Sequence, residues 1–210
     1  MDQWRVSNPG GCNLRSSPMF STNIVGTLGL SSVVTVTGDV KNDFVPVQMW
    51  AHKSMLVPQS DVPYISQWSA TANLITSDCG ETCCLMLAQA NGKATDKTVD
   101  DCVRLLKNYD GWTTPGDLVA LLGSLGLPAR TTNVLAPMTI CLIDYSKVRP
   151  ELKQDQGFAG HHWVLAISVG DSVVYHDPDF WGDATWKGAN KSVSAVDFKS
   201  WCAGFYVCVA

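Results

Sequence analysis

The chain has 210 residues, 46% of them hydrophobic, which suffices for the core of one large domain or two modest ones. Its formal net charge of −4 at pH 7, with no run of basic residues, excludes the electrostatic footprint of nucleic-acid binding. No uninterrupted apolar stretch reaches the roughly 18 residues that a membrane-spanning helix needs, so we expect no membrane insertion.

The N-terminal residues, MDQWRVSNPGG, lack a basic region followed by an apolar one, so no signal peptide is visible. We therefore expect synthesis in the cytoplasm, and a monomer. The eight cysteines are too sparse for a disulfide scaffold, and their spacing matches no paired zinc-ligand pattern. No metal and no cofactor is expected.

The first 57 residues carry short β-rich runs separated by turn residues: IVGTLGL (24–30), VVTVTGDV (33–40) and FVPVQMW (44–50). Such runs predict a small barrel or sandwich in residues 1–57. Two prolines bracket the polar stretch PQSDVP, which predicts a linker at residues 58–60.

A different pattern begins after the linker. Residues 79–90 and 115–125 predict helices, and residues 162–178 predict a strand hairpin. Residues 61–210 should therefore form an α+β domain.

The helix at residues 79–90 has a recognisable start and end. Asp78, followed three residues later by Glu81, predicts a capping box that makes Cys79 the first helical residue. Asn91-Gly92 predicts the C-terminal stop. Between them the sequence is apolar almost all round, so Cys83 and Cys84 are interpreted as packing residues.

Cys79 occupies the N-terminus of this predicted helix, where a reactive thiol is favoured. The partial positive charge of a helix N-terminus favours a thiolate, whereas the charge of Asp78 opposes it, so a positive partner such as an imidazolium is required. Gly80 beside the thiol should leave room for a substrate. The helix alone leaves an ordinary buried cysteine as an equal alternative.

The hairpin supplies candidate partners for the thiol. A two-residue turn at Gly170-Asp171 would place His162 opposite Asp179 and diagonal to Asp177, on one face. A three-residue loop would spoil this register. His161 is the rival base. A cysteine peptidase needs this set of a thiolate, an imidazole and a group that orients it.

The N-terminal half resembles a bacterial SH3-type (SH3b) domain. The matching segments are CNLRSSP (12–18), IVGTLGLSSVVTVTG (24–38) and MWAHKSML (49–56). The resemblance implies an SH3-like β-barrel that binds cell-wall peptide or glycan. The family's usual Gly-Trp before the fourth strand is replaced by Asp43-Phe44, and a spacer barrel that binds nothing is the alternative.

The C-terminal part resembles the C39-like members of the papain-like cysteine peptidases. The matching segments are VPYISQW (62–68), DCGETCCLMLAQANG (78–92), WTTPGDLVALLGSLGL (112–127), GHHWVLAIS (160–168) and VVYHDPDFWG (173–182). The resemblance implies a nucleophile at Cys79, a general base and acid at His162, and an orienting carboxylate at Asp177. It also implies an oxyanion hole formed by Gln67 and the backbone N–H of Cys79. Glu81 stands where the family usually has proline.

Together these features predict a hydrolase of peptide bonds, with Trp68, Gly80, Trp163 and His161 as substrate-binding residues. Cell-wall peptides are the expected substrate, in an endolysin-like protein that acts on the wall after release or secretion. Two alternatives stay open: a peptidase that cleaves protein or leader peptides, and a catalytically silent wall-binding protein.

Overall fold

The computed structural model describes residues 3–6, 12–15, 24–28, 33–39, 41, 43–46, 50–52, 56–58, 62–69, 74–75, 77–107 and 112–210. The chain forms two compact units, residues 1–60 and 61–210. Pro58, which the sequence analysis assigns to the linker, is the last residue of a strand in the first unit.

The first unit consists of short antiparallel strands in two sheets. One sheet has the order β4-β1-β7 and the other β3-β2-β6-β5. The strands are β1 (Gln3–Val6), β2 (Cys12–Arg15), β3 (Ile24–Leu28), β4 (Val33–Thr35), β5 (Phe44–Pro46), β6 (Trp50–His52) and β7 (Leu56–Pro58). Pro46 and Pro58 are the last residues of the edge strands β5 and β7, and edge strands are where proline is tolerated in a sheet.

Parts of the three SH3b-like segments fall outside the described residues, namely 16–18, 29–32, 49 and 53–55. The parts that are described lie mainly in strands, with Cys12 buried; Phe44, which lies between the second and third segments, is also buried. The SH3-like barrel itself stays a prediction.

The second unit is built on a six-stranded antiparallel sheet with the order β12-β11-β10-β9-β13-β8. Its strands are β8 (Ala129–Thr132), β9 (Thr139–Asp144), β10 (His161–Val169), β11 (Ser172–His176), β12 (Lys191–Ser194) and β13 (Cys202–Val209). Short 3₁₀ turns occupy Tyr145–Lys147, Pro150–Leu152 and Gly182–Gly188.

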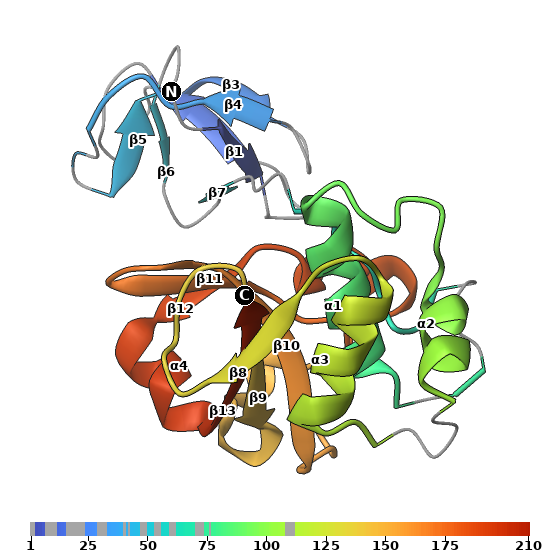
Figure 1. Ribbon diagram of the computed structural model, residues 1–210. Helices are drawn as coiled ribbons and strands as arrows, with labels where there is room; N and C mark the ends of the chain where they lie inside the picture. Colours follow the sequence, from blue (N-terminus) through green and yellow to red (C-terminus); the bar gives the residue numbers. More distant parts are fainter. Residues whose placement is uncertain are drawn as a thin grey trace. The chain divides into compact units, whose positions relative to one another are not determined.

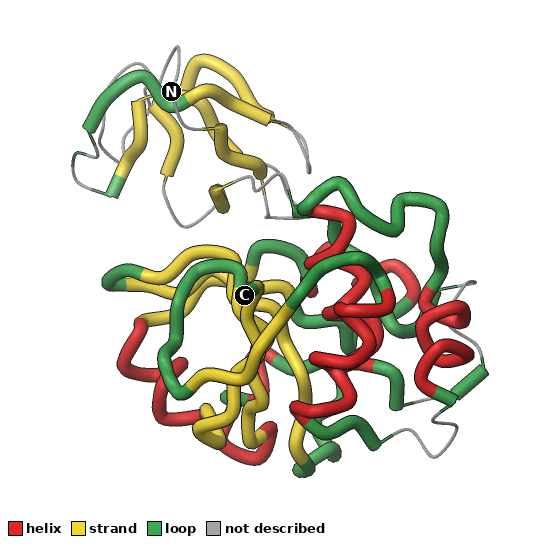
Figure 2. Tube along the Cα trace, in the orientation of Figure 1, coloured by secondary structure: helices red, strands yellow, loops and turns green. Residues whose placement is uncertain are grey.

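Helices cover both faces of this sheet. Figure 1 shows α1 and α3 on one side and α4 on the other, and Figure 2 shows the same division in red and yellow. The helices are α1 (Cys79–Ala90), α2 (Val99–Leu106), α3 (Pro115–Ser124) and α4 (Ala195–Trp201). The predicted α+β class is confirmed. Within the described residues, none of these helices has the length and apolarity to cross a membrane.

Strand β10 supplies both cores because its side chains alternate between the faces. Trp163 and Leu165 pack with the helices α1, α2 and α3 in one cluster. Val164 and Ala166 pack with α4 in the other. Because β10 is an inner strand of the sheet, it is paired on both sides, and its first residues lie next to the start of α1.

Three of these four helix starts obey local capping rules, and at α4 the Ser194 hydroxyl accepts from the N–H of Asp197 at 3.0 Å. Thr98 and Thr114 begin α2 and α3 with complete capping boxes to Asp101 and Asp117. The capping box predicted for α1 is wrong: Asp78 is the N-cap residue but makes no side-chain cap bond. Glu81 is instead fully buried near groups of α2 and α3. Its side chain therefore packs in the core and does not bond to the N-cap residue.

Candidate active site

Cys79 is the first residue of α1 and lines an open cleft, where its side chain is half-buried. The next two cysteines face inward and are completely buried. The thiol of Cys83 donates to the carbonyl of Trp163 at 3.5 Å, and that of Cys84 to the carbonyl of Leu118 at 3.7 Å. Of the three thiols in this stretch, only Cys79 therefore faces the cleft.

The β10–β11 hairpin has the predicted register beyond the bulge, but its turn differs from the predicted one. Its loop has three residues, so the predicted two-residue turn is wrong. A β-bulge between Ala166 and Ser168 then adds one residue on β10, which restores the register beyond it. The pairs are Val169–Val173, Ser168–Val174, Ala166–Tyr175 and Leu165–His176. His162 and Asp177 consequently share a face, as a two-residue turn would have required.

His162 and Asp177 are joined by a buried hydrogen bond. Nε2 of His162 lies 2.9 Å from Oδ1 of Asp177, and both residues are almost completely buried. His161, the rival base, is exposed at the cleft. Burial lowers the pKa of His162, but the charge of Cys79 and hydrogen bonds with Asp177 and Cys79 outweigh it and raise the pKa to about 10. The arrangement can thus hold an imidazolium beside a thiolate.

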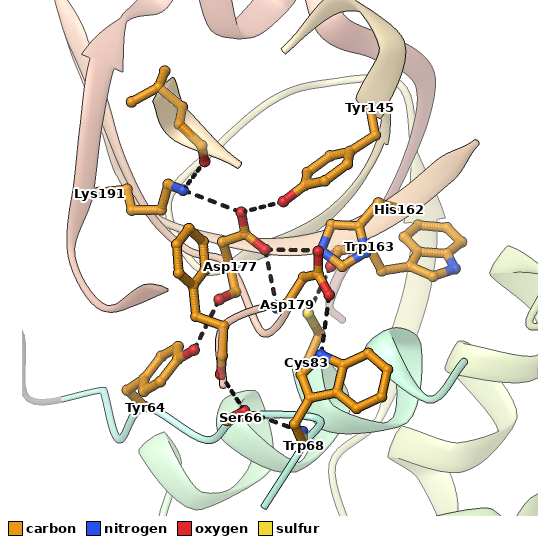
Figure 3. A network of polar contacts seen from close by, with 12 residues as sticks. Tyr64, Ser66, Trp68, Cys83, Tyr145, His162, Trp163, Asp177, Asp179 and Lys191 are labelled. Carbon is orange, nitrogen blue, oxygen red and sulfur yellow. Dashed lines mark hydrogen bonds and ion pairs between the residues drawn. The ribbon is translucent and has the colours of Figure 1, made fainter. Parts of the chain in front are cut away.

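Asp177 accepts hydrogen bonds on both carboxylate oxygens (Figure 3). Oδ1 accepts from His162 and from the backbone N–H of Asp179 at 3.1 Å. Oδ2 accepts from the hydroxyl of Tyr145 at 3.0 Å and from Nζ of Lys191 at 3.2 Å. Burial by itself raises the pKa of Asp177, but the Lys191 charge and the bond to His162 hold it well below its usual range.

Segment 62–69 is bonded to the residues that follow β11, and it carries Gln67 into the cleft. The N–H of Gln67 donates to the carbonyl of Pro178 at 3.0 Å, and the indole of Trp68 donates to Oδ1 of Asp179 at 3.0 Å. The hydroxyl of Tyr64 also donates to the carbonyl of Asp177 at 3.0 Å. These bonds fix Gln67, which is buried and lines the same cleft as Cys79.

The cleft has a volume of about 420 Å³. Of the predicted substrate-binding residues, Trp68, Trp163 and His161 contribute to its lining. Its full lining is Gln67, Trp68, Ser77, Cys79, Trp112, Thr113, Leu142, Asp155, Phe158, His161, His162, Trp163 and Asp179. Its walls therefore combine aromatic rings with a few polar groups, as ligand sites commonly do.

Gly80 does not line the cleft, which corrects the expectation that it makes room for a substrate. A Cβ added there would lie 2.4 Å from Oγ1 of Thr113 and 2.9 Å from Cδ2 of Leu118. The missing side chain is therefore needed for α1 to pack closely against α3 and the residues before it.

Sequence reasoning missed Lys191, Tyr145 and the contact of Asp179 with Trp68. A signal for Lys191 exists in the sequence KSVS of β12, where period-2 alternation places Lys191 on the same buried face as Val193. No comparable local pattern marks Tyr145, which follows the end of β9.

No family model and no curated protein matches the sequence. Among solved structures, the chain is similar to the peptidase domain of Streptococcus ComA, a bi-functional ABC transporter involved in a quorum-sensing pathway. That match has a TM-score of 0.51 at 16% identity and covers 71% of this chain and 98% of that domain.

A second solved structure is a double-glycine-motif protease from an AMS/PCAT transporter in complex with the leader peptide. Its TM-score is 0.46 at 14% identity, over 71% of this chain and 91% of that one. The likeness to the ComA domain shows that the chain shares the fold of that domain.

Proposed function

We propose that the protein is a cysteine peptidase in which Cys79 is the nucleophile, His162 the general base and acid, and Asp177 the residue that orients His162. The observation that carries this proposal is the buried His162–Asp177 bond of 2.9 Å, at the cleft that Cys79 lines from the start of α1. A thiolate at a helix N-terminus next to an imidazolium is a nucleophile ready to attack.

The chemistry follows from these positions. The Cys79 thiolate attacks the scissile carbonyl carbon, and the new oxyanion accepts hydrogen bonds from the Cys79 backbone N–H and the Gln67 amide. Because Nε2 of His162 is bonded to Asp177, the ring's Nδ1 carries the proton that passes to the leaving amine as the C–N bond breaks. A water molecule, deprotonated by His162, then attacks the thioester and releases the acid and the thiolate.

We further propose that the substrate is a cell-wall peptide, and that the protein acts on the wall after release or secretion. The support is the resemblance of residues 1–57 to SH3b domains, which would hold the enzyme on the wall. The aromatic cleft, with Trp68 and Trp163, suits an extended peptide.

The test compares the wild type with Cys79→Ala on purified peptidoglycan, by loss of turbidity and by mass spectrometry of the released fragments. Cys79→Ala should reduce lysis by at least about 10⁴-fold, because a triad that loses one member loses most of its catalysis. Cys208→Ala is the control, since Cys208 lies outside the cleft.

Each outcome decides between the candidate functions. If the wild type does not lyse the wall but cleaves casein or a leader peptide, its substrate is a protein and not a cell-wall peptide. Iodoacetamide that labels Cys79 no faster than Cys208 would leave a catalytically silent protein and overturn the peptidase.

A further inference from the structure

Lys191 is a buried cation next to the proposed triad. It lies on β12, is 8% exposed, and its Nζ donates to Oδ2 of Asp177 at 3.2 Å and to the carbonyl of Leu152. The ring of Phe180 lies 4.1 Å from Nζ. Burying an ammonium group is costly unless it is paired, and the carboxylate of Asp177 is the charged partner of Lys191.

The charges at the proposed site alternate in sign along the chain of contacts. In the reactive state Cys79 is negative, His162 positive, Asp177 negative and Lys191 positive, so the four groups together are neutral. Without Lys191 the three remaining groups would carry a net charge of −1. A buried carboxylate whose cation is removed takes up a proton more easily.

We propose that Lys191 is a positioning residue of the peptidase, whose ammonium group keeps Asp177 ionised and holds its carboxylate toward His162. The proposal rests on the function proposed above. Lys191 contacts no cleft-lining residue by a hydrogen bond that is described, so it acts through Asp177 and not on the substrate.

Asp177 is surrounded by other groups whose charge could matter, and Lys191 is the one cation among them besides His162 in the described part of the chain. Tyr145 and the Asp179 backbone complete its hydrogen bonds. The titratable groups that face it from the neighbouring elements are His162, Tyr145, Tyr64, Tyr175, Cys83, Asp179 and Lys191.

The experiment measures the rate at which iodoacetate alkylates Cys79, followed by peptide mapping, between pH 4 and 11. The imidazolium attracts this anionic reagent to the thiolate, so alkylation slows when His162 loses its proton. The bond and charge of Asp177 help to raise the pKa of His162. Loss of the Asp177 charge in Lys191→Met should therefore let the imidazolium lose its proton at lower pH. The upper end of the fast-alkylation range should move down by roughly one unit or more, as in Asp177→Asn.

The double variant Lys191→Met/Asp177→Asn tests whether Lys191 acts through Asp177. It should alkylate no more slowly than Asp177→Asn alone, because no carboxylate is left to hold. Lys191→Gln, which keeps a donor without the charge, provides a second neutral variant if the methionine variant unfolds. Lys199→Met, an exposed lysine of α4, is the matched control.

Three results would overturn the proposal. The pH range could stay unchanged while only the melting temperature falls, which is a structural role. It could move to higher pH, which would mean that Lys191 merely opposes the imidazolium. The double variant could also alkylate more slowly than Asp177→Asn alone, which would mean that Lys191 does not act through Asp177. By contrast, a wild type whose Cys79 is unreactive overturns the peptidase itself.

Discussion

Two buried carboxylic acids in the second unit have opposite surroundings. Asp177, 1% exposed, accepts four hydrogen bonds, two of them from the cation Lys191 and from His162. Glu81, 0% exposed, makes no side-chain hydrogen bond to any other residue that the structure describes. Asp78 is likewise 0% exposed and makes no such bond within the described residues. Burial raises the pKa of Glu81 to about 7 and that of Asp78 to about 8, while their own backbone amides only partly offset this.

The difference shows that partners decide whether a buried acid is charged. Donors keep Asp177 ionised, where an anion supports the imidazolium. At the start of α1, no side chain among the described residues donates a hydrogen bond to Asp78, and burial raises its pKa to about 8, so it is mostly protonated at pH 7. A neutral Asp78 does not oppose a thiolate at Cys79, and this resolves the electrostatic conflict that the sequence posed. The negative charge is therefore held at Asp177, next to the base, and is largely absent from Asp78, the N-cap residue of the nucleophile's helix.

The largest expected effect comes from removing the charge of Asp177, the carboxylate that accepts four hydrogen bonds. Asp177→Asn should lower kcat for peptide hydrolysis on the order of 10³- to 10⁴-fold, because His162 loses both its orientation and the charge that supports it. The measurement is steady-state kinetics on the substrate that wild type cleaves. Asp171→Asn, in the exposed hairpin loop, should match wild type. Near-normal activity of Asp177→Asn would remove Asp177 from the mechanism.

A smaller effect, on the free energy of unfolding, is expected from changing Glu81. The folded-state pKa of Glu81 is about 7, above its ordinary 4.5, so the folded protein binds the extra proton. The associated stability is full below pH 4.5 and is lost as the pH rises through about 7. Glu81→Gln should therefore stabilise the protein at pH 8, by up to about 3 kcal/mol, and have little effect at pH 4.

Urea unfolding at both pH values measures this difference. Glu151→Gln is the control because Glu151 is exposed on the surface. Equal effects of Glu81→Gln at pH 4 and pH 8 would show that Glu81 does not titrate between them in the folded protein.

Local sequence patterns predicted two of the four helices and two of the six strands that the structure describes in the second unit. The predicted helices 79–90 and 115–125 correspond to α1 and α3, because their ends carry turn and cap residues that act locally. The hairpin also corresponds to β10 and β11. Helix α2 is not among those predicted ranges, since it is short and Asp100 and Asp101 dominate its first turn.

What the sequence could not predict depends on contacts across the fold. The bulge at Ala166–Ser168 leaves no mark in the residue types, and the correct register followed from two compensating errors. The capping box of α1 failed because Glu81 is buried by α2 and α3, which are distant in the sequence. Lys191 meets Asp177 only because β12 pairs with β11, so its role needs the sheet order.

The smallest expected effect separates one neutral donor from the charged partners of Asp177. The Tyr145 hydroxyl donates to Oδ2 at 3.0 Å, and burial, followed by the charge of Asp177, raises the pKa of Tyr145 so that it stays protonated. Because Lys191 still holds that oxygen, Tyr145→Phe should slow hydrolysis only about three- to tenfold. Tyr175→Phe is the matched control: its buried hydroxyl has no hydrogen-bond partner within the described residues. Equal kcat values for the two variants would mean that Lys191 and the backbone alone hold Asp177 in place.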